Sequence, residues 1–166
     1  MRGKTVTTIV VLALVVVVLG LFVRGYRQGR QFPEGSPEAA LKEWFGTQTF
    51  GQPQKACNYM TPDSATKVKS FVSADPNAAA DCPSAVAYAV ANPGNSPLFG
   101  VIHQAANGTW SMPDTGVVKI DDKGTTAEVL PTAFDVPGVD ATVMAGRVVM
   151  VKGSDNWLVQ IVKVRS

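Results

Sequence analysis

The apolar run at residues 6–23, VTTIVVLALVVVVLGLFV, constrains this chain more than any other stretch. It carries no charge and no proline, and its few polar positions are small. A helix of this length rises about 27 Å, close to the roughly 30 Å hydrocarbon core of a bilayer. A soluble helix would need a polar face, which this run lacks. The run therefore predicts a transmembrane helix that tethers the rest of the chain to a lipid bilayer.

The flanks of the run favour a permanent anchor over a cleaved signal peptide. Arg2 and Lys4 precede it, and it is longer than the 7–15 apolar residues of a usual signal peptide. The best small-x-small cleavage candidate, at residues 23–25, has Arg24 in its middle. We therefore expect an uncleaved signal-anchor, with a cleaved signal peptide as the weaker alternative. The chain then divides into a cytoplasmic tail at 1–5, the anchor at 6–23, a basic juxtamembrane linker at 24–35 and an extracytoplasmic domain at 36–166.

The orientation of the anchor rests on the cysteines. Arg24, Arg27 and Arg30 follow the run and suit the headgroup layer, so the basic residues are about level on its two sides. Cys57 and Cys82 form a pair, which in an exported domain predicts a disulfide. This favours a single-pass protein of the cell membrane with its N-terminus in the cytoplasm and its domain outside. Two reduced thiols in a cytosolic domain remain the alternative.

Charge and motifs exclude several classes of function. The first 30 residues hold five of the fifteen Lys and Arg and none of the thirteen acids, so the rest has a net charge near −3. No basic stripe is present, which argues against nucleic-acid binding. The chain also lacks a C-x-x-C pair, a His/Cys cluster at metal spacing and a glycine-rich phosphate loop. We expect neither a metal nor a cofactor.

Three helix starts can be read from the sequence. Residues 36–38, 61–63 and 81–83 each combine an N-cap residue with a proline suited to the first helical turn. Leu41, Trp44 and Phe45 follow the first start at helical spacing. A second helical region begins near residue 53 and is capped again at 61–63. A third runs over 84–91. About three helical regions are therefore predicted before residue 95.

After residue 97 the apolar period changes from 3.6 to 2, which predicts strands. The expected strands, in chain order, are 98–104, 110–112, 117–120, 125–136, 142–152 and 156–164. A hairpin turn at 121–124 should place Gly124 in the left-handed conformation. Pro131 predicts an edge position or a bulge. The fold class is therefore α+β, with helices packed on an antiparallel sheet.

This order of elements resembles the nuclear-transport-factor-2-like superfamily, in particular membrane-anchored members from actinobacterial-type bacteria. The resemblance covers about residues 36–164. It rests on SPEAALKEWF, the cysteine-bearing KACNYMTPDSATKV and DCPSAVAYAV, and the final hairpin from Gly153 to NWLVQIVKV. It implies a strongly curved antiparallel sheet wrapped around its helices, a cone with a pocket. Members of that family include enzymes, ligand binders and scaffolds, so the fold fixes no function.

The residues that could line such a pocket are four aromatic side chains and the single histidine: Trp44, Phe45, Tyr59, Tyr88 and His103. Core packing between the helices and the sheet explains the four aromatic residues equally well. His103 falls in an expected strand and is more typical of a packing or surface residue than of a catalytic base. Asp121 and Asp122 indicate turn chemistry. Glu128 and Asp135 flank an apolar strand and favour a solvated sheet face. No serine lies in a G-x-S-x-G setting. We predict no catalytic residue.

Two hypotheses of different class follow. The first is a non-enzymatic interaction or scaffold domain, tethered to the membrane, with a protein partner in the cell envelope. The second is a cone that binds a small ligand in an apolar pocket and could be enzymatic. The lack of converging titratable groups favours the first, while His103 beside a carboxylate in an open pocket would favour the second.

Overall fold

A computed structural model describes residues 32–165 of the chain. Several predictions concern residues outside this range: the tail at 1–5, the anchor at 6–23, most of the linker, and its flanking basic residues Arg2, Lys4, Arg24, Arg27 and Arg30. Among residues 32–165, no helix has both the length and the apolar character needed to cross a bilayer.

The described part is an α+β domain in which five α-helices precede a four-stranded antiparallel sheet. The helices are α2 (Pro37–Thr49), α3 (Pro53–Asn58), α4 (Pro62–Phe71), α5 (Cys82–Ala91) and α6 (Pro97–Ala106). A short 3₁₀-helix, η1 (Ala141–Met144), lies between the second and third strands. The predicted α+β class is confirmed, although the number of helices exceeds the expected three.

The predicted helix starts are confirmed by their caps. The side chains of Ser36, Thr61 and Asp81 each accept a hydrogen bond from the backbone N–H three residues later. Each of these helices also has a proline in its first turn. Because a cap of this kind is made within four consecutive residues, the local sequence is enough to predict it.

The expected strand at 98–104 is wrong, because these residues belong to helix α6. Ser96 accepts a hydrogen bond from the N–H of Phe99, and Pro97 occupies the first turn. This is the same start signal that predicted the other helices. The buried side chains of the helix recur at helical spacing: Leu98, Phe99, Val101, Ile102 and Ala105. His103 therefore lies in the last turn of a helix, not in a strand.

The sheet is a simple meander in the order β1-β2-β3-β4. Its strands are β1 (Val118–Ile120), β2 (Thr126–Val129), β3 (Val148–Lys152) and β4 (Trp157–Ile161). The turn between β1 and β2 places Gly124 at a φ of 67°, as predicted for this hairpin. Neighbouring strands pair antiparallel throughout, with Met150 opposite both Ala127 and Val159.

Two long strands predicted from the sequence are shorter in the structure. Residues 130–147 leave the sheet between β2 and β3, and Asp140 there caps η1 through the N–H of Thr142. Pro131 follows the end of β2 instead of forming a bulge within it. The expected strand at 110–112 is reduced to one isolated bridge between Ser111 and Asp135. Prolines and a local cap stop the ladder earlier than apolar alternation suggested.

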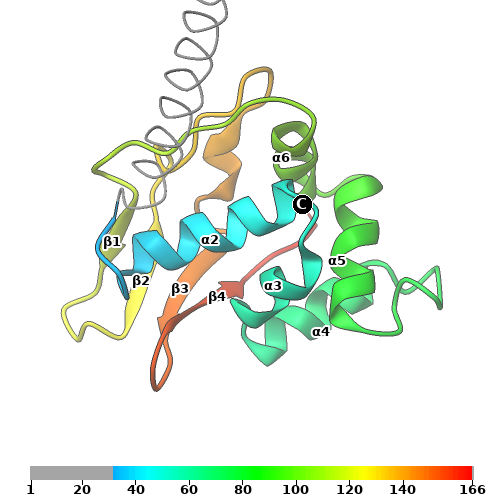
Figure 1. Cartoon of the computed structure of the whole chain (residues 1–166), viewed down its shortest axis with the longest axis horizontal. Coiled ribbons are helices and arrows are strands. Elements are labelled where there is room, and N and C mark those ends of the chain that lie inside the picture. Colours follow the sequence, from blue (N-terminus) through cyan, green and yellow to red (C-terminus); the bar gives the residue numbers. More distant parts are fainter. Residues whose placement is uncertain (1–31, 166) are drawn as a thin grey trace, which may run out of the picture. The chain divides into compact units, whose positions relative to one another are not determined.

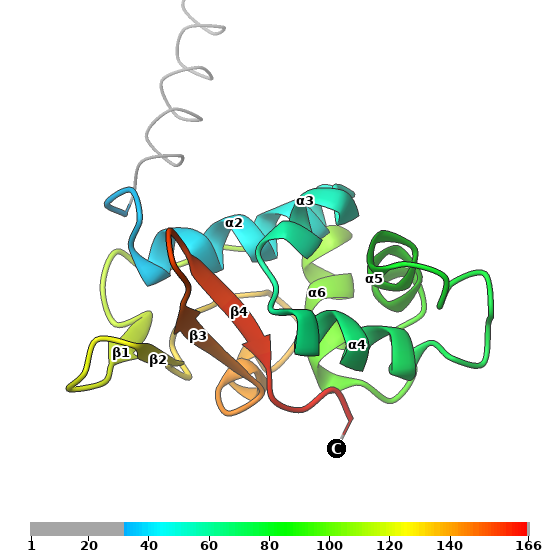
Figure 2. The same ribbon diagram turned by 90° about the horizontal axis from the view of Figure 1, so that it is seen from below.

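Helix α2 and strand β4 contact each other at the centre of the domain, and the start of α4 lies beside the end of β4 (Figure 1; Figure 2). Strands β3 and β4 are buried on one face, through Val148, Met150, Val159 and Ile161 among others. Leu41, Trp44 and Phe45 of α2 are fully buried, as the helical stripe predicted. The core thus lies between the sheet and the helices that precede it.

Candidate functional site

Two of the five predicted pocket residues, Trp44 and Phe45, lie in the hydrophobic core. Both side chains are 0% exposed. The ring of Phe45 stacks on Phe134 with centroids 4.2 Å apart, and meets Trp110 edge-on at 4.9 Å. This aromatic cluster joins α2 to two loop segments that flank the sheet. Such contacts stabilise the core. Trp44 and Phe45 therefore pack the core instead of lining a pocket.

The other three predicted pocket residues have contacts of a different kind. His103 bonds through Nδ1 to the carbonyl oxygen of Val90 at 2.8 Å, and its Nε2 is 3.2 Å from the amide nitrogen of Asn107. Tyr88 is exposed on α5, and the half-buried Tyr59 follows α3. Burial raises the pKa of the Tyr59 phenol, and the nearby Glu43 carboxylate adds to this effect. The hydrogen bond to Val90 thus fastens α6 to the end of α5, whereas the contact with Asn107 lies at the end of α6 itself. Neither involves any of the other four residues.

The largest exposed apolar side chain lies at the end of α2. Phe50 is 75% exposed, more than any other large hydrophobic residue within 32–165. The partly exposed Trp110 lies beside it, since the ring atoms of both lie within 4 Å of where a Cβ of Gly46 would stand. The indole N–H of Trp110 donates to the hydroxyl of Thr49 at 3.2 Å. We call Phe50 and Trp110 the aromatic edge of α2.

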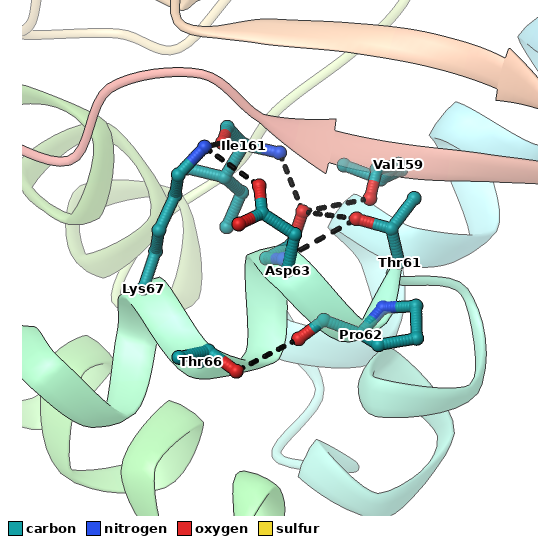
Figure 3. A network of polar contacts seen from close by, with 8 residues as sticks. Thr61, Pro62, Asp63, Thr66, Lys67, Val159 and Ile161 are labelled. Atoms are coloured by element: carbon teal, nitrogen blue, oxygen red, sulfur yellow. Dashed lines mark hydrogen bonds and ion pairs between the residues drawn. The ribbon is translucent and has the colours of Figure 1, made fainter.

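A network of polar contacts covers the outer edge of β4 (Figure 3). Val159 donates its N–H to the carbonyl oxygen of Tyr59 at 2.6 Å and accepts the N–H of Thr61 at 3.0 Å. The hydroxyl of Ser64 accepts the N–H of Ile161 at 2.7 Å and contacts the carbonyl oxygen of Val159 at 3.2 Å. The segment between α3 and α4, together with Ser64, therefore pairs the backbone groups at the edge of β4, as a fifth strand would.

Lys67 completes this network one turn further along α4. Its Nζ donates to the carbonyl oxygen of Ile161 at 2.9 Å and forms an ion pair with Asp63 at 2.8 Å. With this contact, the edge-facing N–H and C=O groups of both Val159 and Ile161 have partners. Sheet edges left open are templates for pairing with other chains, so this cover protects the edge.

Ser64 and Lys67 have the Ser-x-x-Lys spacing that some serine acyl-transfer enzymes place at a helix start. The geometry does not support a nucleophile here. Ser64 is 0% exposed, and its hydroxyl contacts Thr61 Oγ1, Val159 O and Ile161 N. One donor and two acceptor positions are all that a hydroxyl has, so its hydrogen-bonding capacity is filled. Sequence reasoning missed the structural role of both residues.

The predicted disulfide between Cys57 and Cys82 is confirmed, with a Cα–Cα distance of 6.1 Å. It links the last turn of α3 to the first residue of α5 across 25 residues. Both cysteines are half-buried. The bond therefore links two helices that are separated by α4 and a long loop in the chain but pack directly against each other.

The predicted turn chemistry of Asp121 is also confirmed. Its carboxylate accepts hydrogen bonds from the N–H groups of Thr125 and Thr126 and from the Thr125 hydroxyl. These bonds, chiefly that of the Thr126 N–H, lower the pKa of the Asp121 carboxyl. Glu128 and Asp135 are exposed. Within residues 32–165, no three His, Cys, Asp or Glu side chains converge as metal ligands would.

In comparisons with known proteins, no protein-family model, curated protein or solved structure matches the chain.

Proposed function

We propose that this chain is a membrane-tethered, non-enzymatic interaction domain of the cell envelope, and that the aromatic edge of α2 binds a protein partner. The observation that carries the proposal is the 75% exposure of Phe50 on a firmly held scaffold. Large aromatic side chains that are exposed in the free protein and held by rigid neighbours are typical anchors of protein interfaces. Trp110 provides such a neighbour, because Thr49 and Phe45 fix its ring.

The non-enzymatic part of the proposal rests on how the reactive side chains are used. The Ser64 hydroxyl is saturated inside the fold, both ring nitrogens of His103 have partners, and Asp121 serves a turn. A general base or nucleophile needs a free atom within reach of a substrate. These three groups therefore favour binding over catalysis.

The location outside the cell is part of the same proposal. The apolar run at 6–23 supports a tether, and the Cys57–Cys82 disulfide supports an oxidising compartment. A relationship to the nuclear-transport-factor-2-like superfamily remains part of the proposal, and the sequence segments at 36–45, 55–68, 81–90 and 153–164 support it. Together these features favour a partner at the outer surface of the membrane.

Photocross-linking in living cells tests the proposed interface. A photoreactive phenylalanine analogue replaces Phe50 in the full-length chain, and a second variant carries it at Ile120, which is 47% exposed at the sheet edge. We expect one discrete adduct with another protein from position 50, none of that mass from position 120, and loss of the adduct in Trp110→Ala. Equal labelling from both positions, or an adduct between two copies of this chain, would contradict the proposed interface.

A thiol-labelling experiment tests the location separately. Intact cells are treated with a membrane-impermeant thiol reagent, before and after reduction from outside. We expect Cys57 and Cys82 to react only after reduction. Cysteines that stay unlabelled in intact cells, yet react as free thiols after lysis, would place the domain in the cytosol.

A further inference from the structure

The core of the domain contains two polar atoms without a hydrogen-bond partner among the described residues: Trp44 Nε1 and Gln48 Oε1. Trp44 is 0% exposed and Gln48 is 4% exposed. The other buried polar side chains behave differently. Thr47, Ser64 and Ser96 each use their hydroxyl in a hydrogen bond to a backbone carbonyl oxygen. Gln48 is therefore the exception among the buried polar residues.

The orientation of the Gln48 amide is fixed by its own helix. Its Nε2 donates to the carbonyl oxygen of Trp44 at 3.3 Å. Exchanging the amide oxygen and nitrogen would place two carbonyl oxygens against each other, so the oxygen is the atom left over. The two unpartnered atoms are thus one donor, the indole N–H, and one acceptor, the amide oxygen. They belong to residues i and i+4 of α2, which lie on the same face of the helix.

Leaving both atoms without any partner would be costly to the fold. Each buried polar group without a hydrogen bond lowers the ratio of folded to unfolded molecules by about fivefold or more. If no water were present at this place, leucine or methionine at position 48 would give a more stable fold than glutamine. The presence of Trp44 and Gln48 at this place therefore indicates a small bound molecule that accepts one hydrogen bond and donates another.

We propose that a single water molecule is bound inside the domain between Trp44 and Gln48. Its oxygen accepts the indole N–H, and one of its hydrogens is donated to Gln48 Oε1. Internal waters of folded proteins typically make two to four such bonds to buried polar groups. The hydroxyl group of a small organic ligand has the same chemistry, so the test must distinguish the two.

The full-length chain labelled with ¹⁵N allows a direct test by water-selective NOESY and ROESY spectra. Its three tryptophans, Trp44, Trp110 and Trp157, give separate indole resonances, which single Phe substitutions assign one at a time. We expect the Trp44 indole proton to show a cross-peak to water with the signs of dipolar transfer from a long-lived bound molecule. No such cross-peak would overturn the proposal.

Two variants and a mass measurement exclude other sources of this signal. Gln48→Met keeps the side-chain volume and should remove the cross-peak, whereas Thr47→Val should keep it. A signal that disappears in Thr47→Val would come from the Thr47 hydroxyl, and would overturn the proposal. A signal that persists in Gln48→Met would also overturn it, because the water would not need the amide oxygen. Finally, cross-peaks from the indole to a co-purified molecule, seen also by native mass spectrometry, would replace the water by a ligand.

Discussion

The hydroxyl of Ser64, in the first turn of α4, accepts the backbone N–H of Ile161 in β4 at 2.7 Å, although 97 residues separate them in the chain. The same hydroxyl contacts the carbonyl oxygen of Val159 at 3.2 Å. A single side chain thus pairs two backbone groups at the edge of the sheet. If the hydroxyl is removed, Val159 O keeps its bond from the N–H of Thr61, but the buried N–H of Ile161 loses its partner and cannot turn to water.

Ser64→Ala should therefore destabilise the domain by about 1–3 kcal/mol, the usual cost of leaving a buried backbone N–H unpaired. Denaturant unfolding of the full-length chain measures this change. Thr66→Ala is the matched control, since the Thr66 hydroxyl is exposed on the same helix and bonds only to Pro62 O (Figure 3). We expect the control to change stability by less than about 0.5 kcal/mol. Equal effects of the two substitutions would contradict the role assigned to Ser64.

The disulfide should contribute substantially to stability. Cys57 and Cys82 are separated by 25 residues. A bridge that closes a loop of this order stabilises a domain by about 3 kcal/mol in the chain-entropy account. We expect Cys57→Ala/Cys82→Ala to unfold at lower denaturant concentration by a corresponding amount, and to become insensitive to added reductant. A double variant as stable as the oxidised parent protein would contradict this expectation.

Lys67 should matter more through its bond to β4 than through its ion pair. Its Nζ reaches both Ile161 O and Asp63, but the Lys67 and Asp63 side chains are 36% and 58% exposed. Exposed ion pairs of this kind contribute roughly 0–1 kcal/mol. We predict that Lys67→Met costs more stability than Asp63→Asn, measured by denaturant unfolding at low and high salt. A larger loss in Asp63→Asn would show that the ion pair dominates.

Acid should weaken the β1–β2 turn through Asp121. The N–H of Thr126, above all, lowers the pKa of this carboxyl in the folded state. A carboxyl whose pKa is lower in the folded state stabilises the fold above its unfolded pKa of about 3.9, and this stabilisation is lost as the pH falls through the folded value. Asp121→Asn should therefore lower stability at neutral pH and make the decline of stability below about pH 5 less steep.

Asp122→Asn is the control for that pH dependence. It removes an equal charge from the same turn while the three hydrogen bonds of Asp121 remain. Unfolding free energies of both variants between pH 7 and about pH 2 provide the comparison. Should Asp122→Asn flatten the acid decline as much as Asp121→Asn, general charge repulsion would be the cause instead of the hydrogen bonds.

Local signals account for what could be predicted of the helices, the β1–β2 turn and the disulfide. Ser36, Thr61 and Asp81 cap their helices through groups only three residues away, and Gly124 satisfies its turn within the hairpin itself. Helix α6 carried the same start signal, at Ser96 and Pro97. A short apolar run fits the period of a helix or of a strand, so at residues 98–104 only the cap and the proline distinguish the two.

The tertiary structure alone decided how these elements meet. Folding brings together segments about 90 residues apart in the chain. Only then can Ser64 bond to Ile161, or Phe45 stack on Phe134. Nothing in the local sequence of α4 distinguishes a serine that faces solvent from one that completes a sheet edge. The caps, the turns and the cysteine pair could be predicted, because each depends on nearby residues or on covalent chemistry. The buried edge of β4, the exposed Phe50 and the unpartnered atoms of Trp44 and Gln48 arise only from packing, which depends on the whole chain at once.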